Sequence, residues 1–239
     1  AMDFEGRNST EDTVFLMACR GGDEELMRLL AKAGCDTAVA NIYGTNALMS
    51  TCVSGEPQAV RAALAAGWCE LEAEDLDGCT AFLFACNQGH AQCMQLLVEA
   101  GCETAATDKA NANALMHAAV SGEPKAVRAA LAAGWCELEA KDHGGRTAFL
   151  LACNQGHAQC MHLLAEAGCD TAETDKDCAN ALMQAAISGE PKAVRAALAA
   201  GWCGLEARNL GGSTAFLLAC NKGHLECMRV IADAGCNTA

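Results

Sequence analysis

Apolar positions along this chain fall into short clusters of helical period, which are separated by glycines and polar runs. Residues 147–172 read TAFLLACNQGHAQCMHLLAEAGCDTA, in which two apolar segments flank Gly156 and an Ala-Gly pair ends the second segment. Apolar spacings of three and four predict amphipathic helices, and the central glycine breaks the helix between them. A glycine after an apolar segment favours a left-handed helix stop. The stretch therefore predicts a helix, a turn, a second helix and a polar loop.

The same pattern recurs along the chain. NQGHAQCM at 87–94 returns unchanged at 154–161, and AAGWCELEA at 65–73 returns at 132–140. Ala-Gly pairs recur at alternating spacings of 33 and 34, with glycines at 34, 67, 101, 134, 168, 201 and 235. Self-similarity at a fixed period is typical of stacked repeats. We expect a single all-α solenoid over residues 1–239, with seven repeats at approximately 11–43, 44–77, 78–110, 111–144, 145–177, 178–211 and 212–239.

Two repeat types alternate in a unit of 67 residues. Type A reads TAFLLACNQGHAQCM and starts near residues 13, 80, 147 and 214; type B reads NALMHAAVSGEPKAV and starts near 46, 113 and 180. In type B a proline opens the second helix, where its missing N–H costs nothing. The second helix of type A carries Cys, Met and two Leu, whereas that of type B carries mainly Ala, with one Val and one Leu. Alternating bulky and small layers are expected to interdigitate in one shared core.

These repeats resemble the ankyrin repeat family in their period, in the A-x-x-G-H between the helices and in the G-x-T before the first helix. The resemblance covers nearly the whole chain. It implies stacked helix pairs, hairpin-like finger loops projecting to one side, and a concave face that binds proteins. The family's T-P-L-H signature is altered to TAFL at 147–150 and to NALM at 113–116. We therefore expect apolar packing in place of the family's usual polar ladder between repeats.

Composition narrows the choice of partners and compartment. The chain has 16 basic and 30 acidic residues, a net charge of −14, which disfavours nucleic acids and anionic membranes. No apolar run reaches the length of a bilayer span, so membrane insertion is not expected. The start, AMDFEGRNSTED, lacks the charged and apolar regions of a signal peptide, so we expect no export and 17 mostly reduced cysteines that pack as small hydrophobes. We expect a cytoplasmic, intracellular protein.

Cys153, His157, Cys160 and His162 are residue types that bind zinc or act as nucleophile and base. Structural zinc sites need closely spaced ligand pairs that converge on the ion. Here Gly156 separates the two helices, so the side chains are expected to point apart. A nucleophile and base also need an orienting group and an oxyanion site, which the sequence does not indicate. We predict core cysteines, no metal, no cofactor, no catalytic residue and no enzymatic activity.

Two further recurring residue types have structural interpretations. His90, His157 and His224 open second helices and are expected to bond local backbone or a neighbouring repeat. Trp68, Trp135 and Trp202 recur at loop starts, where they could form a binding stripe or cover the edge between two repeats. Their strict recurrence favours packing, because a tryptophan buries a large apolar area.

Positions that differ between repeats define the predicted binding surface, since packing residues are kept in a duplicated unit. They occupy the finger tips and the polar ends of the first helices, which in ankyrin repeats line the concave face. Tyr43, the only tyrosine, is the leading single contact. The predicted partner-binding residues are Ile42, Tyr43, Thr45, Leu76, Asp77, Asn87, Gln88, Lys109, His143, Arg146, Asn154, Gln155, Lys176, Leu210, Asn221 and Lys222.

The sequence therefore favours a non-enzymatic module that binds a protein partner of unknown identity through its concave face. Two alternatives remain at this point. One is a purely structural or designed repeat array without a specific partner, and the other is a redox or metal sensor based on the cysteines. A monomer or a weak dimer is expected, with dimerisation through an end of the stack or through exposed thiols such as Cys79 and Cys178.

Overall fold

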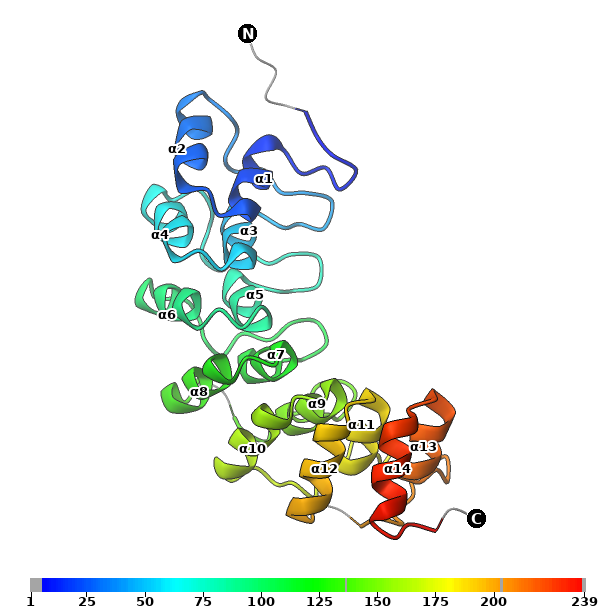
Figure 1. The fold of residues 1–239 in the computed structure, drawn as a ribbon. Coiled ribbons are helices and arrows are strands. Elements are labelled where there is room, and N and C mark those ends of the chain that lie inside the picture. The colour runs from blue at the N-terminus through cyan, green and yellow to red at the C-terminus, as the bar shows by residue number, and fades with distance from the viewer. Residues whose placement is uncertain (1–5, 136, 203, 238–239) are drawn as a thin grey trace. The chain divides into compact units, whose positions relative to one another are not determined.

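The computed structural model describes residues 6–135, 137–202 and 204–237, which form fourteen α-helices (Figure 1). The helices are α1 Val14–Gly21, α2 Glu24–Lys32, α3 Ala47–Ser54, α4 Pro57–Ala66, α5 Ala81–Asn87, α6 Ala91–Glu99, α7 Ala114–Ser121, α8 Pro124–Ala133, α9 Ala148–Gln155, α10 Ala158–Glu166, α11 Ala181–Ser188, α12 Pro191–Ala200, α13 Ala215–Lys222 and α14 Leu225–Asp233. The only β-type pairings in the described ranges are isolated bridges, Arg7 with Thr13 and Thr107 with Asn113. The all-α prediction is confirmed.

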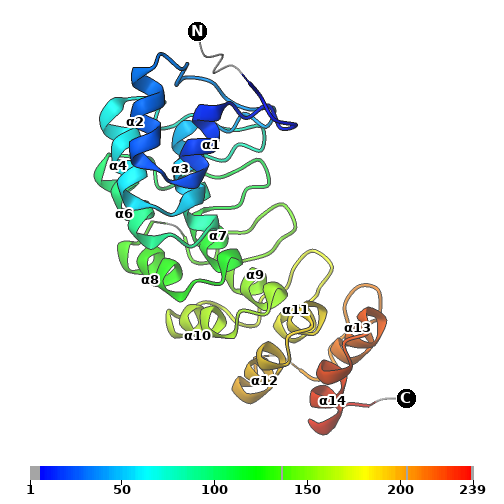
Figure 2. The same ribbon diagram turned by 45° about the horizontal axis from the view of Figure 1, so that its top comes forward.

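The chain divides into two compact units, residues 1–117 and 118–239, and the division falls within α7. In the first unit α1, α3 and α5 form one row and α2, α4 and α6 a second, with the finger loops projecting beyond the first row (Figures 1 and 2). In the second unit α9, α11 and α13 form the first-helix row, and α10, α12 and α14 pack behind it. Stacked helix pairs are therefore confirmed within each unit, while a single solenoid over 1–239 stays a prediction.

The helix boundaries follow from local side-chain chemistry. Thr80 and Asn180 cap α5 and α11, because their side-chain oxygens accept the N–H groups of Leu83 and Met183 at 3.4 and 3.0 Å. Such caps satisfy backbone donors that a helix start leaves unpaired. Prolines open α4, α8 and α12, and left-handed glycines end these three helices. The predicted Pro start and Gly stop are confirmed.

The core contains the side chains expected from the repeat pattern. Cys153, Cys160 and Met161 are fully buried, as predicted for packing residues. Leu150 and Met116 occupy the signature position at which the family places a histidine, and both are buried. Apolar packing has replaced the usual polar group at this position, as expected.

The Gly-His histidines connect consecutive repeats. Nε2 of His157 lies 3.1 Å from the carbonyl oxygen of Val120, near the end of the preceding first helix, and Nε2 of His224 lies 3.1 Å from that of Ile187. His90 makes the equivalent contact with Val53 at 3.4 Å. These bonds satisfy carbonyls that a helix end leaves without an intrahelical partner. The predicted backbone role of these histidines is confirmed.

The tryptophans pack on the preceding type A repeat. The ring of Trp68 lies edge-on to Phe15 with centroids 5.0 Å apart, and Trp202 meets Phe149 in the same way at 5.1 Å. Both phenylalanines are fully buried, whereas both tryptophans are half-buried. Edge-to-face pairs add to the stabilisation from burial itself. The packing interpretation is confirmed for these two tryptophans.

Candidate binding surface at the finger tips

Each finger is organised by an aspartate or asparagine at its start. Oδ1 of Asp75 accepts the N–H groups of Asp77 and Cys79 at 2.9 and 2.8 Å. Asp108, Asp142 and Asp175 make the same pair of bonds in their fingers, as does Asn41 in the first finger. A short side chain that bonds its own following backbone fixes a tight turn. In the aspartates, this arrangement leaves Oδ2 available to a neighbouring side chain.

Consecutive fingers are joined through their backbones. In the first unit the N–H of Ile42 donates to Thr10 (3.2 Å), that of Leu76 to Tyr43 (2.9 Å) and that of Lys109 to Asp77 (2.9 Å). In the second unit the N–H groups of Lys176 and Leu210 donate to Gly144 and Asp177 at 3.0 and 2.8 Å. The fingers of each unit therefore lie side by side in a fixed register, because each bond connects one tip to the next.

Glycine is required where one finger approaches the next. Gly78 has a φ of +78°, and a Cβ at this position would lie 3.1 Å from the backbone nitrogen of Lys109. Gly145 has a φ of +77° and would place a Cβ 3.0 Å from the nitrogen of Lys176. Residues with a side chain are disfavoured there both by the left-handed backbone and by the close contact.

Apolar side chains are exposed on adjacent tips of the first unit. Ile42, Tyr43 and Leu76 are 45%, 54% and 62% exposed. The Nζ of Lys109 donates to the carbonyl oxygen of Leu76 at 2.6 Å, so a cation borders these apolar groups. We call these four residues the tip surface. In the second unit the tip residue Leu210 is 72% exposed.

The other predicted partner-binding residues divide by exposure. Thr45 is buried, and its N–H bonds Asn41, so its inclusion in the binding surface was wrong. Arg146 is half-buried, and its guanidinium pairs with Asp142 through Nη2 at 2.7 Å, inside its own finger. The remaining predicted tip and helix-end residues that are exposed are Asp77, Gln88, His143, Gln155, Lys176, Asn221 and Lys222.

Asn87 and Asn154, at the ends of two first helices, make internal bonds instead. Nδ2 of Asn87 lies 3.2 Å from Nδ1 of His117, whose Nε2 lies 3.1 Å from Oδ2 of Asp108. Asn154 donates to Gln184 at 2.7 Å, and Gln184 donates to Asp175 at 2.6 Å. A polar connection between repeats is thus present, carried by helix positions other than the signature one. The sequence analysis missed His117 and Gln184. They stand at equivalent positions of two type B repeats, and the change from histidine to glutamine there could have indicated a functional position.

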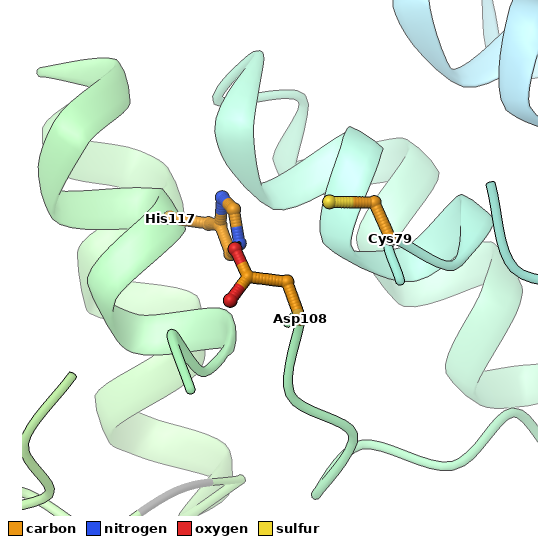
Figure 3. Close-up of side chains that lie close together, drawn as sticks. All are labelled: Cys79, Asp108 and His117. Atoms are coloured by element: carbon orange, nitrogen blue, oxygen red, sulfur yellow. The ribbon is translucent and has the colours of Figure 1, made fainter. Parts of the chain in front are cut away.

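Cys79, Asp108 and His117 form a cluster in the first unit (Figure 3). One candidate ligand atom from each lies within 4.8 Å of the others, and this is the sole such group of three found among the described residues. Burial lowers the pKa of His117, although Asp108 opposes the shift. Burial also raises the pKa of the Cys79 thiol to about 12, together with the nearby carboxylates of Asp75 and Asp108. Cys79 is half-buried, so its description as an exposed thiol was wrong, whereas Cys178 is exposed as expected.

Comparisons with known proteins agree with this architecture. A sequence model of the ankyrin repeats, spanning three copies, matches residues 58–142, 115–201 and 168–239. Among solved structures, the human ASB11 ankyrin repeat domain superposes with a TM-score of 0.76 at 20% identity, covering 95% of this chain and all of that domain. No curated protein matches the chain. Within the described ranges, no helix is both long and apolar enough to cross a membrane.

Proposed function

Because the chain belongs to the ankyrin repeat family, whose domains generally mediate protein–protein interactions, we propose that it is a non-enzymatic module that binds a protein partner. The binding surface comprises the finger tips and the exposed ends of the first helices. The tip surface of the first unit is its centre, and Tyr43 is the principal contact.

The observation that carries this proposal is the exposed apolar group on adjacent, hydrogen-bonded fingers. Tyr43 and Leu76 are more than half exposed, and a 2.9 Å backbone bond joins their fingers. Exposed aromatic and aliphatic groups that lie together are typical of interaction sites, and tyrosine is enriched among residues that dominate binding energy. Fingers held in register lose little conformational freedom on binding, which favours affinity.

The net charge of the chain indicates which charged groups a partner should present. With a net charge of −14, the chain attracts proteins that present basic groups around an apolar contact. Asp77 is exposed on the same finger as Leu76 and supplies one such negative group beside the tip surface. We therefore propose a partner with an apolar anchor and a lysine or arginine that pairs with Asp77.

The experiment is a quantitative affinity capture from cell extract with wild-type protein and two variants. Tyr43→Ser with Leu76→Ser removes two apolar groups from the tip surface. Leu29→Ser is the matched control, because Leu29 is also an exposed leucine, at 56%, but lies on α2 in the second-helix row. We expect a set of proteins captured by the wild type and by the control to be depleted with the double variant.

Two results would contradict the proposal. Equal capture by all three proteins would exclude the tip surface as the contact. Capture of nothing above an empty matrix by any of them would favour a structural array without a specific partner. Unchanged thermal unfolding of the double variant would show that lost capture reflects the surface and not the fold.

A further inference from the structure

We propose that Cys79, Asp108 and His117 form a binding site for one Zn²⁺ ion within the first unit. The three residues come from different elements: Cys79 from the end of one finger, Asp108 from the start of the next, and His117 from α7 (Figure 3). The sequence led us to expect no metal anywhere in the chain, and the present proposal departs from that expectation. It was argued from the Cys153–His162 stretch, where the glycine turn separates the candidate ligands. This cluster instead depends on how the third repeat stacks on the fourth.

The ligand set suits zinc. Thiolate, imidazole and carboxylate are the three side-chain groups that bind Zn²⁺, and three protein ligands leave one tetrahedral position for water. Bond lengths of about 2.0–2.3 Å place tetrahedral ligand atoms roughly 3.3–3.7 Å apart. Nε2 of His117 and Oδ2 of Asp108 are already 3.1 Å apart, and all three candidate atoms lie within 4.8 Å. Small side-chain movements would close the site around the ion.

Two of the three ligands are already oriented by neighbouring groups. Oδ1 of Asp108 is held by the N–H groups of Ala110 and Ala112 at 2.9 and 2.8 Å, which directs Oδ2 toward His117. The other ring nitrogen of His117, Nδ1, lies 3.2 Å from the side-chain amide of Asn87. With zinc on Nε2, Nδ1 of His117 carries the proton. Nδ1 then donates to the Asn87 side-chain oxygen, once the Asn87 amide group has flipped to exchange its oxygen and nitrogen. Such partners fix the orientation of metal-binding histidines and carboxylates.

The site is partly shielded from water. The side chains of His117 and Asp108 are 11% and 13% exposed, and Cys79 is half-buried. Figure 3 shows the Cys79 sulfur directed toward the His117–Asp108 pair. On binding, the thiol proton leaves to solvent and the sulfur bonds the metal, so the thiolate and carboxylate together balance the two positive charges of the ion.

The repeats contain an internal control for this interpretation. One 67-residue unit further along, the equivalent positions hold Arg146, Asp175 and Gln184. There Gln184 takes the place of the imidazole and donates to Asp175 at 2.6 Å, and Arg146 takes the place of the cysteine, so the carboxylate is the one zinc-binding group of the three. The two 67-residue stretches 79–145 and 146–212 differ at 14 positions, and two of these differences lie together at this one place. A metal site requires a metal-binding side chain at both positions 79 and 117. Packing alone does not require cysteine and histidine to occur there together.

The test is a zinc titration of the full chain under reducing conditions, by competition with a chromophoric chelator. His117→Gln and Cys79→Ser are the informative variants, because glutamine and serine stand at equivalent positions, Gln184 and Ser213, and are compatible with the fold. Cys178→Ser is the control for adventitious thiol binding, since Cys178 is an exposed thiol in the second unit. Circular dichroism checks that each variant is folded.

We expect the wild type and Cys178→Ser to bind one more equivalent of Zn²⁺ than either informative variant, with a Kd of about 1 μM or tighter. Co²⁺ should then give thiolate charge-transfer absorption in the wild type that Cys79→Ser lacks. Zinc should raise the melting temperature of the wild type and not that of His117→Gln, because ligand binds the folded state. Equal zinc binding by wild type and both informative variants would overturn the proposal, as would a wild type that binds none in the micromolar range.

Discussion

At the residue scale, the two carboxylate oxygens of a finger aspartate have different roles. Oδ1 of Asp75, Asp108, Asp142 and Asp175 holds the backbone of the finger, while Oδ2 of three of them contacts a side chain that varies between repeats: His117, Arg146 or Gln184. The fold needs only the first of these roles. The side chain that contacts Oδ2 can change from repeat to repeat without destabilising the turn. This explains why the residue type differs at these positions in an otherwise repetitive chain.

The first prediction concerns Asp75. Asp75→Ala removes the acceptor of two backbone N–H groups and should destabilise the protein by about 1–3 kcal/mol. Asp75→Asn should cost less than about 0.5 kcal/mol, because Asn41 makes the same two bonds in its own finger at 3.0 Å each. Urea unfolding of both variants measures the difference. Equal losses would show that the carboxylate charge, and not the two bonds, fixes the turn.

A second residue-scale prediction concerns pH. Burial alone would raise the pKa of Asp12, but hydrogen bonds from Asn41, Thr10 and Asn8, with the charge of Arg20, lower it below its usual value. A carboxylate with a lowered pKa in the folded state stabilises above its unfolded pKa, near 3.9, and the contribution is lost as the pH falls through the folded value. The stability difference between wild type and Asp12→Asn should therefore be present at pH 7 and shrink below about pH 4. Urea unfolding at both pH values measures this difference. A pH-independent difference would contradict the assignment.

At the element scale, the contact between one first helix and the next Gly-His turn requires both a glycine and a histidine. Gly122 ends α7 with a φ of +75°, and the ring of His157 covers it while bonding Val120. Gly55 and Gly189 are covered by His90 and His224 in the same way. In each of these three turns the histidine therefore packs on the end of the preceding first helix. This contact sets the register between the two repeats.

The third prediction uses two left-handed glycines as a matched pair. A Cβ at Gly122 would lie 2.5 Å from Cε1 of His157, whereas one at Gly134 would meet no atom of the described residues within 4 Å, its two chain neighbours apart. Gly134→Ala should cost about 1–2 kcal/mol from backbone strain alone. Gly122→Ala should cost a further 1–3 kcal/mol, about the usual range for overpacking. Chemical unfolding of the two variants gives the comparison, and equal costs would show that the histidine moves away freely.

The elements were predictable because their signals are local. Pro124 and Gly134 mark the ends of α8 within the sequence itself, and Thr80 marks the start of α5. The buried state of Thr45 was missed because its position beside variable tip residues suggested exposure, whereas its N–H turns inward to Asn41. The Cys79, Asp108 and His117 cluster was missed because it forms only when one repeat stacks on another, a register that no single stretch of sequence encodes.

At the scale of the whole molecule, we propose that repetition supplies stability and that departures from repetition supply recognition. Stacked repeats share a continuous core, so substitutions at tips and helix ends change the surface without changing the packing. Ile42, Tyr43 and Leu76 are such departures, and their fingers are fixed by backbone bonds. Recognition of a protein partner by this tip surface is the central claim.

The most direct test uses the partner identified in the capture experiment. Isothermal titration calorimetry measures its Kd for the wild type, for Tyr43→Ala and for Leu29→Ala. Central aromatic contacts commonly contribute about 2 kcal/mol or more, so Tyr43→Ala should weaken binding by roughly thirtyfold. Leu29→Ala should leave the Kd within about twofold of wild type, because exposed groups outside a contact contribute little. A Kd unchanged by Tyr43→Ala, or weakened equally by both substitutions, would contradict the claim that the tip surface binds the partner.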